Sequence, residues 1–84
     1  GAYAASKAGV HRLTEALADE YKGRVTVNAV LPSIIDTPAN RKDMPDADWS
    51  TWVRADELAV VIGFLVSEDA SGITGALIPV TGRV

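Results

Sequence analysis

Apolar side chains recur at helical spacing in the first quarter of the chain. Val10, Leu13 and Leu17 lie three or four positions apart, and Gly23 follows as a natural helix stop. This spacing predicts a helix over Ala2–Lys22. We expect one face of it to meet a second helix, because small side chains that permit close approach line that face: Ala5, Ala8, Gly9 and Ala16.

The pattern changes to alternation after this helix. Between Arg24 and Pro32 every second residue is apolar and β-branched residues dominate, which predicts a strand that the proline ends. From Ser33 to Val53 the chain is polar and irregular, with two prolines and two tryptophans. A connector of this length is typical of a functional lid or binding loop, and we refer to Ser33–Val53 as the lid.

A second helix is predicted over Ala55–Ser67, with Asp56 and Glu57 in its first turn, where they suit the helix dipole. Its middle is apolar on every side, so we expect it to be covered on more than one face. A short final strand follows at Ala76–Val80, in which Pro79 indicates an edge position or the strand's end. The order helix, strand, lid, helix, strand predicts an α/β fold with two parallel strands. Because so few elements cannot cover one another, we expect more sheet or a second chain.

Composition places the chain among soluble globular sequences. It has 84 residues, 48% of them apolar and 23% charged, and a net charge of −3. The absence of a basic cluster leaves a nucleic-acid partner without electrostatic support. The absence of cysteine excludes cysteine-based metal sites and fits a reducing cytoplasm. The longest apolar run, Leu58–Val66, is far shorter than the about 20 residues of a membrane span, so we expect a cytoplasmic protein without a membrane partner.

Tyr3 and Lys7 are the main candidates for chemistry. Four positions apart on a helix, they lie on one face, one above the other. A lysine ammonium about 4 Å from a tyrosine favours the phenolate by roughly 4 kcal/mol at an effective dielectric of about 20. Such a tyrosine is poised as a general acid or base. Taken alone, such a pair is more often plain surface decoration. We expect His11, the only histidine, to be structural or exposed and to lack an acidic neighbour in helical register.

Three motifs together resemble the C-terminal third of the short-chain dehydrogenase/reductase family: YAASKAG, VNAVLPSIIDTP and FLVSEDASGITGALIPVTG. That family has a Tyr-x-x-x-Lys pair opening a long helix, a strand ending Asn-Ala-x-x-Pro-Gly with a threonine soon after, and a late Phe-Leu-x-Ser helix before the last strand. The resemblance implies part of a Rossmann-type doubly wound parallel sheet, with residues 1–84 as the C-terminal catalytic portion of one domain. The chain begins at Gly1 without methionine and lacks the family's glycine-rich phosphate loop, so we expect a fragment whose cofactor-binding half is missing.

The resemblance also implies roles for individual residues. Tyr3 would exchange a proton with the substrate while hydride moves to or from the nicotinamide of NAD or NADP. Lys7 would hold the nicotinamide ribose and lower the pKa of the tyrosine. Four more residues match the segment that lies against the nicotinamide: Pro32, Ser33, Ile35 and Thr37. The family usually has glycine in place of Ser33, and an ordinary strand end is the alternative for Pro32 and Ser33.

The lid has a narrower resemblance, to the dihydropteridine reductases. The stretch LPSIIDTPANRKDMPDADWSTW shares their Leu-Pro, Asp-Thr-Pro, Asn-Arg-Lys and Met-Pro pattern, and GVHRL is similar to their helix. This implies that Met44, Trp49 or Trp52 lines the pocket of a planar heterocycle. The open alternative is that both tryptophans only anchor the lid on the body of the protein.

Two classes of function follow. The first is a nicotinamide-dependent oxidoreductase with a small-molecule substrate and no metal. The second is an inactive fragment that acts as a self-association module. In the family, the helix with the Tyr-Lys pair forms a four-helix interface in the dimer, and the last strand and its preceding helix build another contact. The small-residue face of the first helix and the apolar second helix fit this role, so we expect a homo-oligomer, either a dimer or a tetramer.

Overall fold

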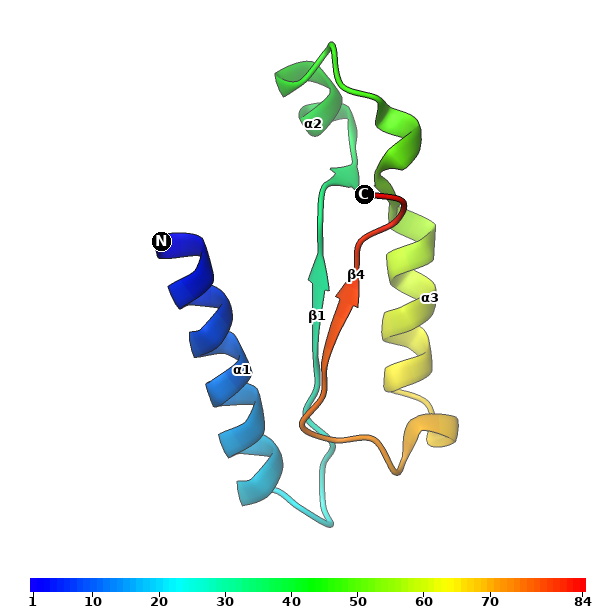
Figure 1. The fold of residues 1–84 in the computed structure, drawn as a ribbon. Coiled ribbons are helices and arrows are strands. Elements are labelled where there is room, and N and C mark those ends of the chain that lie inside the picture. The colour runs from blue at the N-terminus through cyan, green and yellow to red at the C-terminus, as the bar shows by residue number, and fades with distance from the viewer.

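The computed structural model describes residues 1–84, except for the side chain of Tyr3. Two helices flank a pair of strands (Figure 1). The helices are α1 (Ala2–Glu20) and α3 (Ala55–Leu65), and the strands are β1 (Ala29–Pro32) and β4 (Leu77–Val80). β1 pairs with β4 in parallel, as predicted for two strands joined through a helix. The predicted α/β fold with parallel strands is confirmed.

The lid is more regular than predicted. It contains a short strand, a one-to-two-turn helix and a 3-10 helix, and it leads into another short strand: β2 (Ile35–Asp36), α2 (Pro38–Asp43), η1 (Trp49–Thr51) and β3 (Val53–Arg54). The expectation of an irregular segment is wrong because local capping signals were overlooked. Thr37 precedes Pro38, and its Oγ1 accepts the Asn40 N–H at 3.1 Å, which starts α2. β2 pairs in parallel with β3, so the two ends of the lid meet.

The first strand is shorter than the predicted Arg24–Pro32, because β1 begins only at Ala29. The residues before it bond to the loop that precedes β4 instead of forming a ladder. The Val27 N–H donates to Thr74 Oγ1 at 3.0 Å. The Asn28 side chain makes two bonds to the main chain of the same loop, at 3.1 and 3.0 Å. The N–H groups of Arg24 and Val25 donate to the Tyr21 carbonyl, so the first half of the predicted strand consists of the turn after α1 and of a stretch bonded to this loop.

The elements leave much of one another uncovered. Among the described side chains, apolar burial is confined to a small set: Ala18, Trp52, Val53, Leu65 and Ala70. On α1, Leu13 is 60% exposed, and on α3, Val60 is 72% exposed. What covers the rest of α3 and the small-residue face of α1 stays a prediction. No described helix has the length and apolar character that crossing a membrane requires.

One end of the fold gathers the parts that matter for function. Because β1 and β4 run in parallel, their carboxyl ends lie at the same edge, where the lid begins (Figure 1). α1 runs the opposite way, so its N-terminal end lies level with that edge (Figure 1). In open α/β sheets, ligands bind outside the carboxyl ends of the strands. This edge is therefore the place to look for a site.

Candidate functional site

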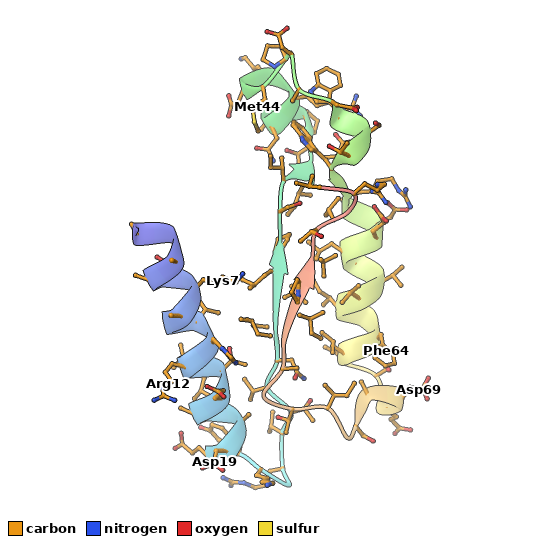
Figure 2. All side chains as sticks on the ribbon, viewed as in Figure 1. Lys7, Arg12, Asp19, Met44, Phe64 and Asp69 are labelled. Atoms are coloured by element: carbon orange, nitrogen blue, oxygen red, sulfur yellow. The ribbon has the colours of Figure 1, made fainter. Side chains whose placement is uncertain are left out.

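The predicted catalytic pair lies at the start of α1. Positions 3 and 7 are one turn apart within Ala2–Glu20. Lys7 is exposed, and Figure 2 shows its side chain on the side of α1 that faces β1. The side chain of Tyr3 lies outside the described part of the structure, so its pairing with Lys7 stays a prediction.

His11, one turn beyond Lys7, is exposed as expected. The expectation that it lacks an acidic neighbour is wrong. Its Nε2 lies 3.8 Å from Oε2 of Glu15, because residues four apart share one face of a helix. Both side chains are about half exposed, so this is a surface contact of α1 and not part of the site.

Pro32 and Ser33 lie where β1 ends. Pro32 is opposite Val80, the last pair of the parallel register. The Ser33 N–H donates to the Val80 carbonyl at 3.4 Å, and its Oγ donates to the Thr81 carbonyl at 2.9 Å. The hydroxyl that replaces the family's glycine thus ties the end of β1 to the segment that follows β4.

Ile35 and Thr37 lie in the adjoining segment and share one partner, Asn40. The Asn40 side chain donates through Nδ2 to the Ile35 carbonyl at 2.8 Å. Its backbone N–H donates to Thr37 Oγ1 at 3.1 Å. Asn40 was not singled out from the sequence, although its place three residues after a Thr-Pro helix start was the available signal. The four residues predicted to contact the cofactor therefore form one continuous, locally ordered segment at the carboxyl edge.

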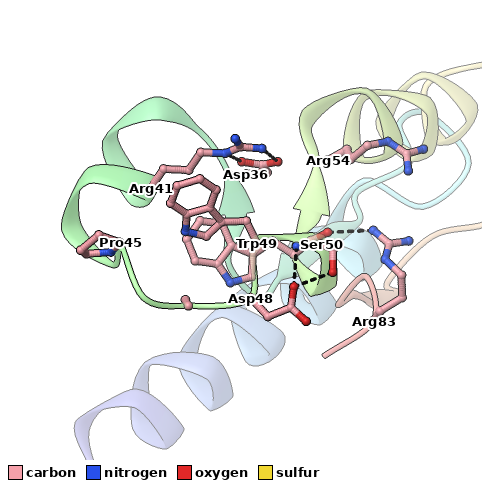
Figure 3. A pocket seen from close by; sticks show the side chains of 10 residues that line it. Asp36, Arg41, Pro45, Asp48, Trp49, Ser50, Arg54 and Arg83 are labelled. Carbon is pink, nitrogen blue, oxygen red and sulfur yellow. Dashed lines mark hydrogen bonds and ion pairs between the residues drawn. The ribbon is translucent and has the colours of Figure 1, made fainter.

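The two tryptophans lie together along a groove of about 730 Å³ in the lid (Figure 3). Their ring centres are 6.4 Å apart with planes inclined at 44°. Trp52 is only 3% exposed, whereas Trp49 is half-buried and donates from Nε1 to the Met44 carbonyl at 2.9 Å. The burial of Trp52 supports the anchoring alternative for that residue. Substrate contact by Met44, Trp49 or Trp52 stays a prediction.

An ion pair that sequence reasoning missed forms one wall of this groove. Arg41 donates from Nε and Nη2 to the two carboxylate oxygens of Asp36, at 2.6 and 2.8 Å. Its guanidinium carbon also lies 4.5 Å from the centre of the Trp49 ring. The hydrogen bonds from Arg41 hold the pKa of Asp36 below its ordinary value. Asp36 precedes α2 and Arg41 lies within it, so a helical spacing rule does not predict this ion pair.

Arg83 also lines the groove (Figure 3), and it takes part in a second ion pair, with Glu57. Arg83 donates to both carboxylate oxygens of Glu57, at 3.0 and 2.6 Å, and to the Trp52 carbonyl at 2.7 Å. Glu57 also accepts the Arg54 N–H at 3.0 Å, which caps α3. The bonds from Arg83, and secondly the one from the Arg54 backbone, lower the pKa of Glu57 to about 2. The sequence places Glu57 correctly at a helix start, but a partner 26 positions away leaves no local signal.

Three kinds of donor group could hold the nicotinamide half of a dinucleotide. They comprise the Lys7 ammonium, the Thr37 hydroxyl and the main chain of β2, which match a ribose diol and a carboxamide in hydrogen-bonding character. The pyrophosphate has no comparable glycine-rich loop in these 84 residues. Within the described part of the chain, no group of three His, Cys, Asp or Glu residues could hold a metal ion.

Comparisons with known proteins agree with this geometry. A family model described as enoyl-(acyl carrier protein) reductase matches residues 1–82. A 3-oxoacyl-[acyl-carrier-protein] reductase of Pseudomonas aeruginosa is 43% identical over 95% of this chain. A short-chain type dehydrogenase/reductase from Mycobacterium ulcerans is 30% identical, with a TM-score of 0.82 over 99% of this chain and 34% of its own. A 4-hydroxyisoleucine dehydrogenase complexed with NADH is 27% identical, with a TM-score of 0.81 over 96% of this chain and 38% of its own.

The chain spans about a third of the length of such relatives, namely 36% of the Pseudomonas reductase. The match extends over nearly all 84 residues and includes the helix of the Tyr-Lys pair, the strand β1 and the strand β4. None of these relatives is a dihydropteridine reductase, so they lend no support to the pterin-like lid. The chain belongs to the matched reductase family, within the short-chain dehydrogenases/reductases.

Proposed function

We propose that the protein containing this chain is an NAD(P)-dependent oxidoreductase that interconverts a ketone and a secondary alcohol. One observation carries the proposal: the start of α1, with Tyr3 and Lys7, lies at the same edge as the carboxyl ends of β1 and β4 in a chain of this family (Figure 1). The names of the relatives support the substrate class, since one is a 3-oxoacyl reductase and another a hydroxy amino acid dehydrogenase. The NADH in the second of these supports the cofactor.

Tyr3 and Lys7 would carry the proton transfer. In the direction of reduction, the Tyr3 phenol gives its proton to the carbonyl oxygen as that oxygen gains charge, and it takes a proton from the alcohol in reverse. The Lys7 ammonium, one helical turn away, favours the phenolate left behind and offers donors to the ribose hydroxyls. The nicotinamide, when bound, supplies or accepts the hydride at the carbon.

The segment from Pro32 to Thr37 would hold the nicotinamide ring. Its order is supported by the bonds that Asn40 makes to Ile35 and Thr37, and by the bond from Ser33 to the chain beyond β4. Pro32 limits the flexibility of the strand end because its ring fixes φ. These residues are thus arranged before any ligand arrives, which lowers the entropic cost of binding.

The lid would contact the substrate. Met44 and Trp49 are half-buried and joined by a hydrogen bond, and Trp49 lines the groove. The lid motif that resembles the dihydropteridine reductases makes a quinonoid dihydropterin the competing substrate. The burial of Trp52 weakens that choice, because a residue that is only 3% exposed offers little surface for stacking on a heterocycle.

The test is a turnover assay on the full-length protein with NADH and NADPH in turn. Cofactor oxidation is followed with a 3-oxoacyl thioester, a 2-enoyl thioester and quinonoid dihydropterin. We expect NADH or NADPH to be oxidised only when the 3-oxoacyl thioester is present. Oxidation with the enoyl thioester or the pterin alone would contradict the substrate class. Failure to bind either cofactor would overturn the oxidoreductase assignment itself.

A second candidate is self-association of this part of the protein. Apolar side chains stand exposed on α3 and just after it, with Val60 at 72%, Phe64 at 47% and Val66 at 81%. Exposed apolar surface of this kind marks interfaces. The chain should then form a dimer or tetramer. A monomeric mass by light scattering at micromolar concentration would contradict this role, whereas it would leave the oxidoreductase assignment of the full-length protein intact.

A further inference from the structure

The segment after β4 crosses from the strand pair to the end of the lid (Figure 1). We refer to Thr81–Arg83 as the C-terminal clasp. Its main chain bonds to the lid, since the Arg83 N–H donates to the Thr51 carbonyl at 2.9 Å. Gly82 has φ +66°, and a Cβ there would lie 2.9 Å from the Trp52 carbonyl carbon and the Val53 nitrogen. The clasp and the lid therefore pack main chain against main chain.

The Arg83 side chain extends this contact to α3. One guanidinium joins the Trp52 carbonyl, at 2.7 Å, to the Glu57 carboxylate, at 2.6 and 3.0 Å. Because the guanidinium bonds to two acceptor groups, its position is fixed more tightly than a single hydrogen bond would fix it. The lid end and the first turn of α3 are thus fixed relative to each other through Arg83.

The clasp also reaches the segment proposed to hold the nicotinamide, by two routes. Ser33 Oγ donates to the Thr81 carbonyl at 2.9 Å, which joins the end of β1 to the clasp directly. The second route runs through the short strands. The Val53 N–H donates to the Ile34 carbonyl at 3.0 Å, and Ile35 pairs with Val53 in the parallel register. Each link is a hydrogen bond or a ladder pair.

From these contacts we propose that Arg83 is a positioning residue, which sets the geometry of Ser33–Thr37 through the clasp. The inference rests on the proposed function, because it concerns the segment assigned there to the nicotinamide. Arg83 is 47% exposed and Glu57 is 28% exposed in their side chains. Ion pairs so open to solvent contribute little to global stability. Removing the pair should therefore loosen the segment that it holds without unfolding the protein.

Kinetics of the full-length protein give the first test, with Arg83→Ala compared with wild type. The Michaelis constant for the nicotinamide cofactor should rise about 3- to 30-fold, the range expected when a coupled contact is lost. Turnover at saturating cofactor and substrate should change less than the Michaelis constant for the cofactor does, because the proton-transfer pair is untouched. Arg83→Lys keeps the charge but cannot bond to the same acceptors in a fork. Its Michaelis constant for the cofactor should therefore lie between those of wild type and Arg83→Ala.

The matched control is Arg12→Ala, which removes the same charge from an 87% exposed side chain on α1. Its cofactor constant should equal that of wild type. An unchanged constant in Arg83→Ala, or an equal rise in Arg12→Ala, would overturn the positioning role while the oxidoreductase assignment stands.

Hydrogen exchange provides a second test of the positioning role, one that does not depend on enzymatic activity. In Arg83→Ala, backbone amides of residues 33–37 should exchange faster than in wild type, and those of α1 should not change. Unchanged exchange at residues 33–37 would overturn the inference. If the wild-type protein shows neither cofactor binding nor turnover, the proposed function fails, and the exchange result still decides whether the clasp orders this segment.

Discussion

Replacing Gly82 by alanine measures how tightly the C-terminal clasp packs on the lid. The residue has φ +66°, a conformation that an alanine adopts only with strain. The new methyl carbon would also lie 2.9 Å from the Trp52 carbonyl carbon and the Val53 nitrogen, and 3.0 Å from the Thr51 carbonyl oxygen. All three are main-chain atoms, so none of them can swing aside as a flexible side chain would.

Two costs add at this position. A left-handed backbone costs about 1–2 kcal/mol for a residue with a Cβ. Crowding against fixed atoms costs about 1–3 kcal/mol more. We therefore expect Gly82→Ala to lower the free energy of unfolding by about 2–5 kcal/mol. Gly23 is the matched control, because its φ is +84° but nothing lies within 4 Å of the added Cβ. Gly23→Ala should lose only the backbone term, about 1–2 kcal/mol.

The assay is urea unfolding of the full-length protein, with both variants measured beside wild type. Gly63→Ala serves as a reference of opposite sign, because Gly63 lies inside α3 with nothing within 4 Å of an added Cβ. It should raise the free energy of unfolding by about 0.5–1 kcal/mol, since alanine favours a helix interior. If Gly82→Ala costs no more than Gly23→Ala, the close packing of the clasp on the lid is refuted.

Three further predictions concern the elements around the site. Because the folded pKa of Glu57 is about 2, below its ordinary 4.5, its stabilising pair with Arg83 is fully present above about pH 4.5 and is lost as the pH falls from there toward 2. Unfolding measured across that window should show a slightly smaller acid loss in Glu57→Gln, because a pair so open to solvent adds little stability, and a larger loss in the variant would contradict the pairing. Val53 is fully buried, so Val53→Ala should cost about 1.5–3 kcal/mol in denaturant unfolding, and an unchanged unfolding curve would contradict its place in the core. Thr37→Ala should cost about 1 kcal/mol by loss of the cap of α2, and Thr37→Ser should retain most of it; equal unfolding curves for the two would show that the hydroxyl does not cap the helix.

The periodic parts of the fold could be predicted from the sequence, and the lid could not. α1 and α3 follow from apolar spacing and from Gly23 and Glu57 near their ends, and the structure ends both within two residues of expectation. β1 was predicted too long because Val27 has the same β-branched pattern as the strand but bonds to a loop side chain. The residue pattern alone does not distinguish a strand residue paired in a ladder from one that bonds to a loop side chain.

The candidate site divides in the same way. Tyr3 and Lys7 could be singled out because four-residue spacing on a helix is a local signal. The Asp36–Arg41 pair over Trp49 depends on how the chain turns into α2, and the bond from Arg83 to Glu57 joins residues 26 positions apart. Such contacts are consequences of the assembled fold and leave no spacing that a sequence pattern could detect.

The central claim is that Tyr3 transfers the proton in a nicotinamide-dependent reaction. It is tested most directly by Tyr3→Phe in the full-length protein, with cofactor binding and turnover measured on the same preparation. The variant should bind NADH or NADPH as wild type does and lose turnover by about 10²- to 10⁴-fold, the usual contribution of a general acid. Unchanged turnover in Tyr3→Phe would contradict the account.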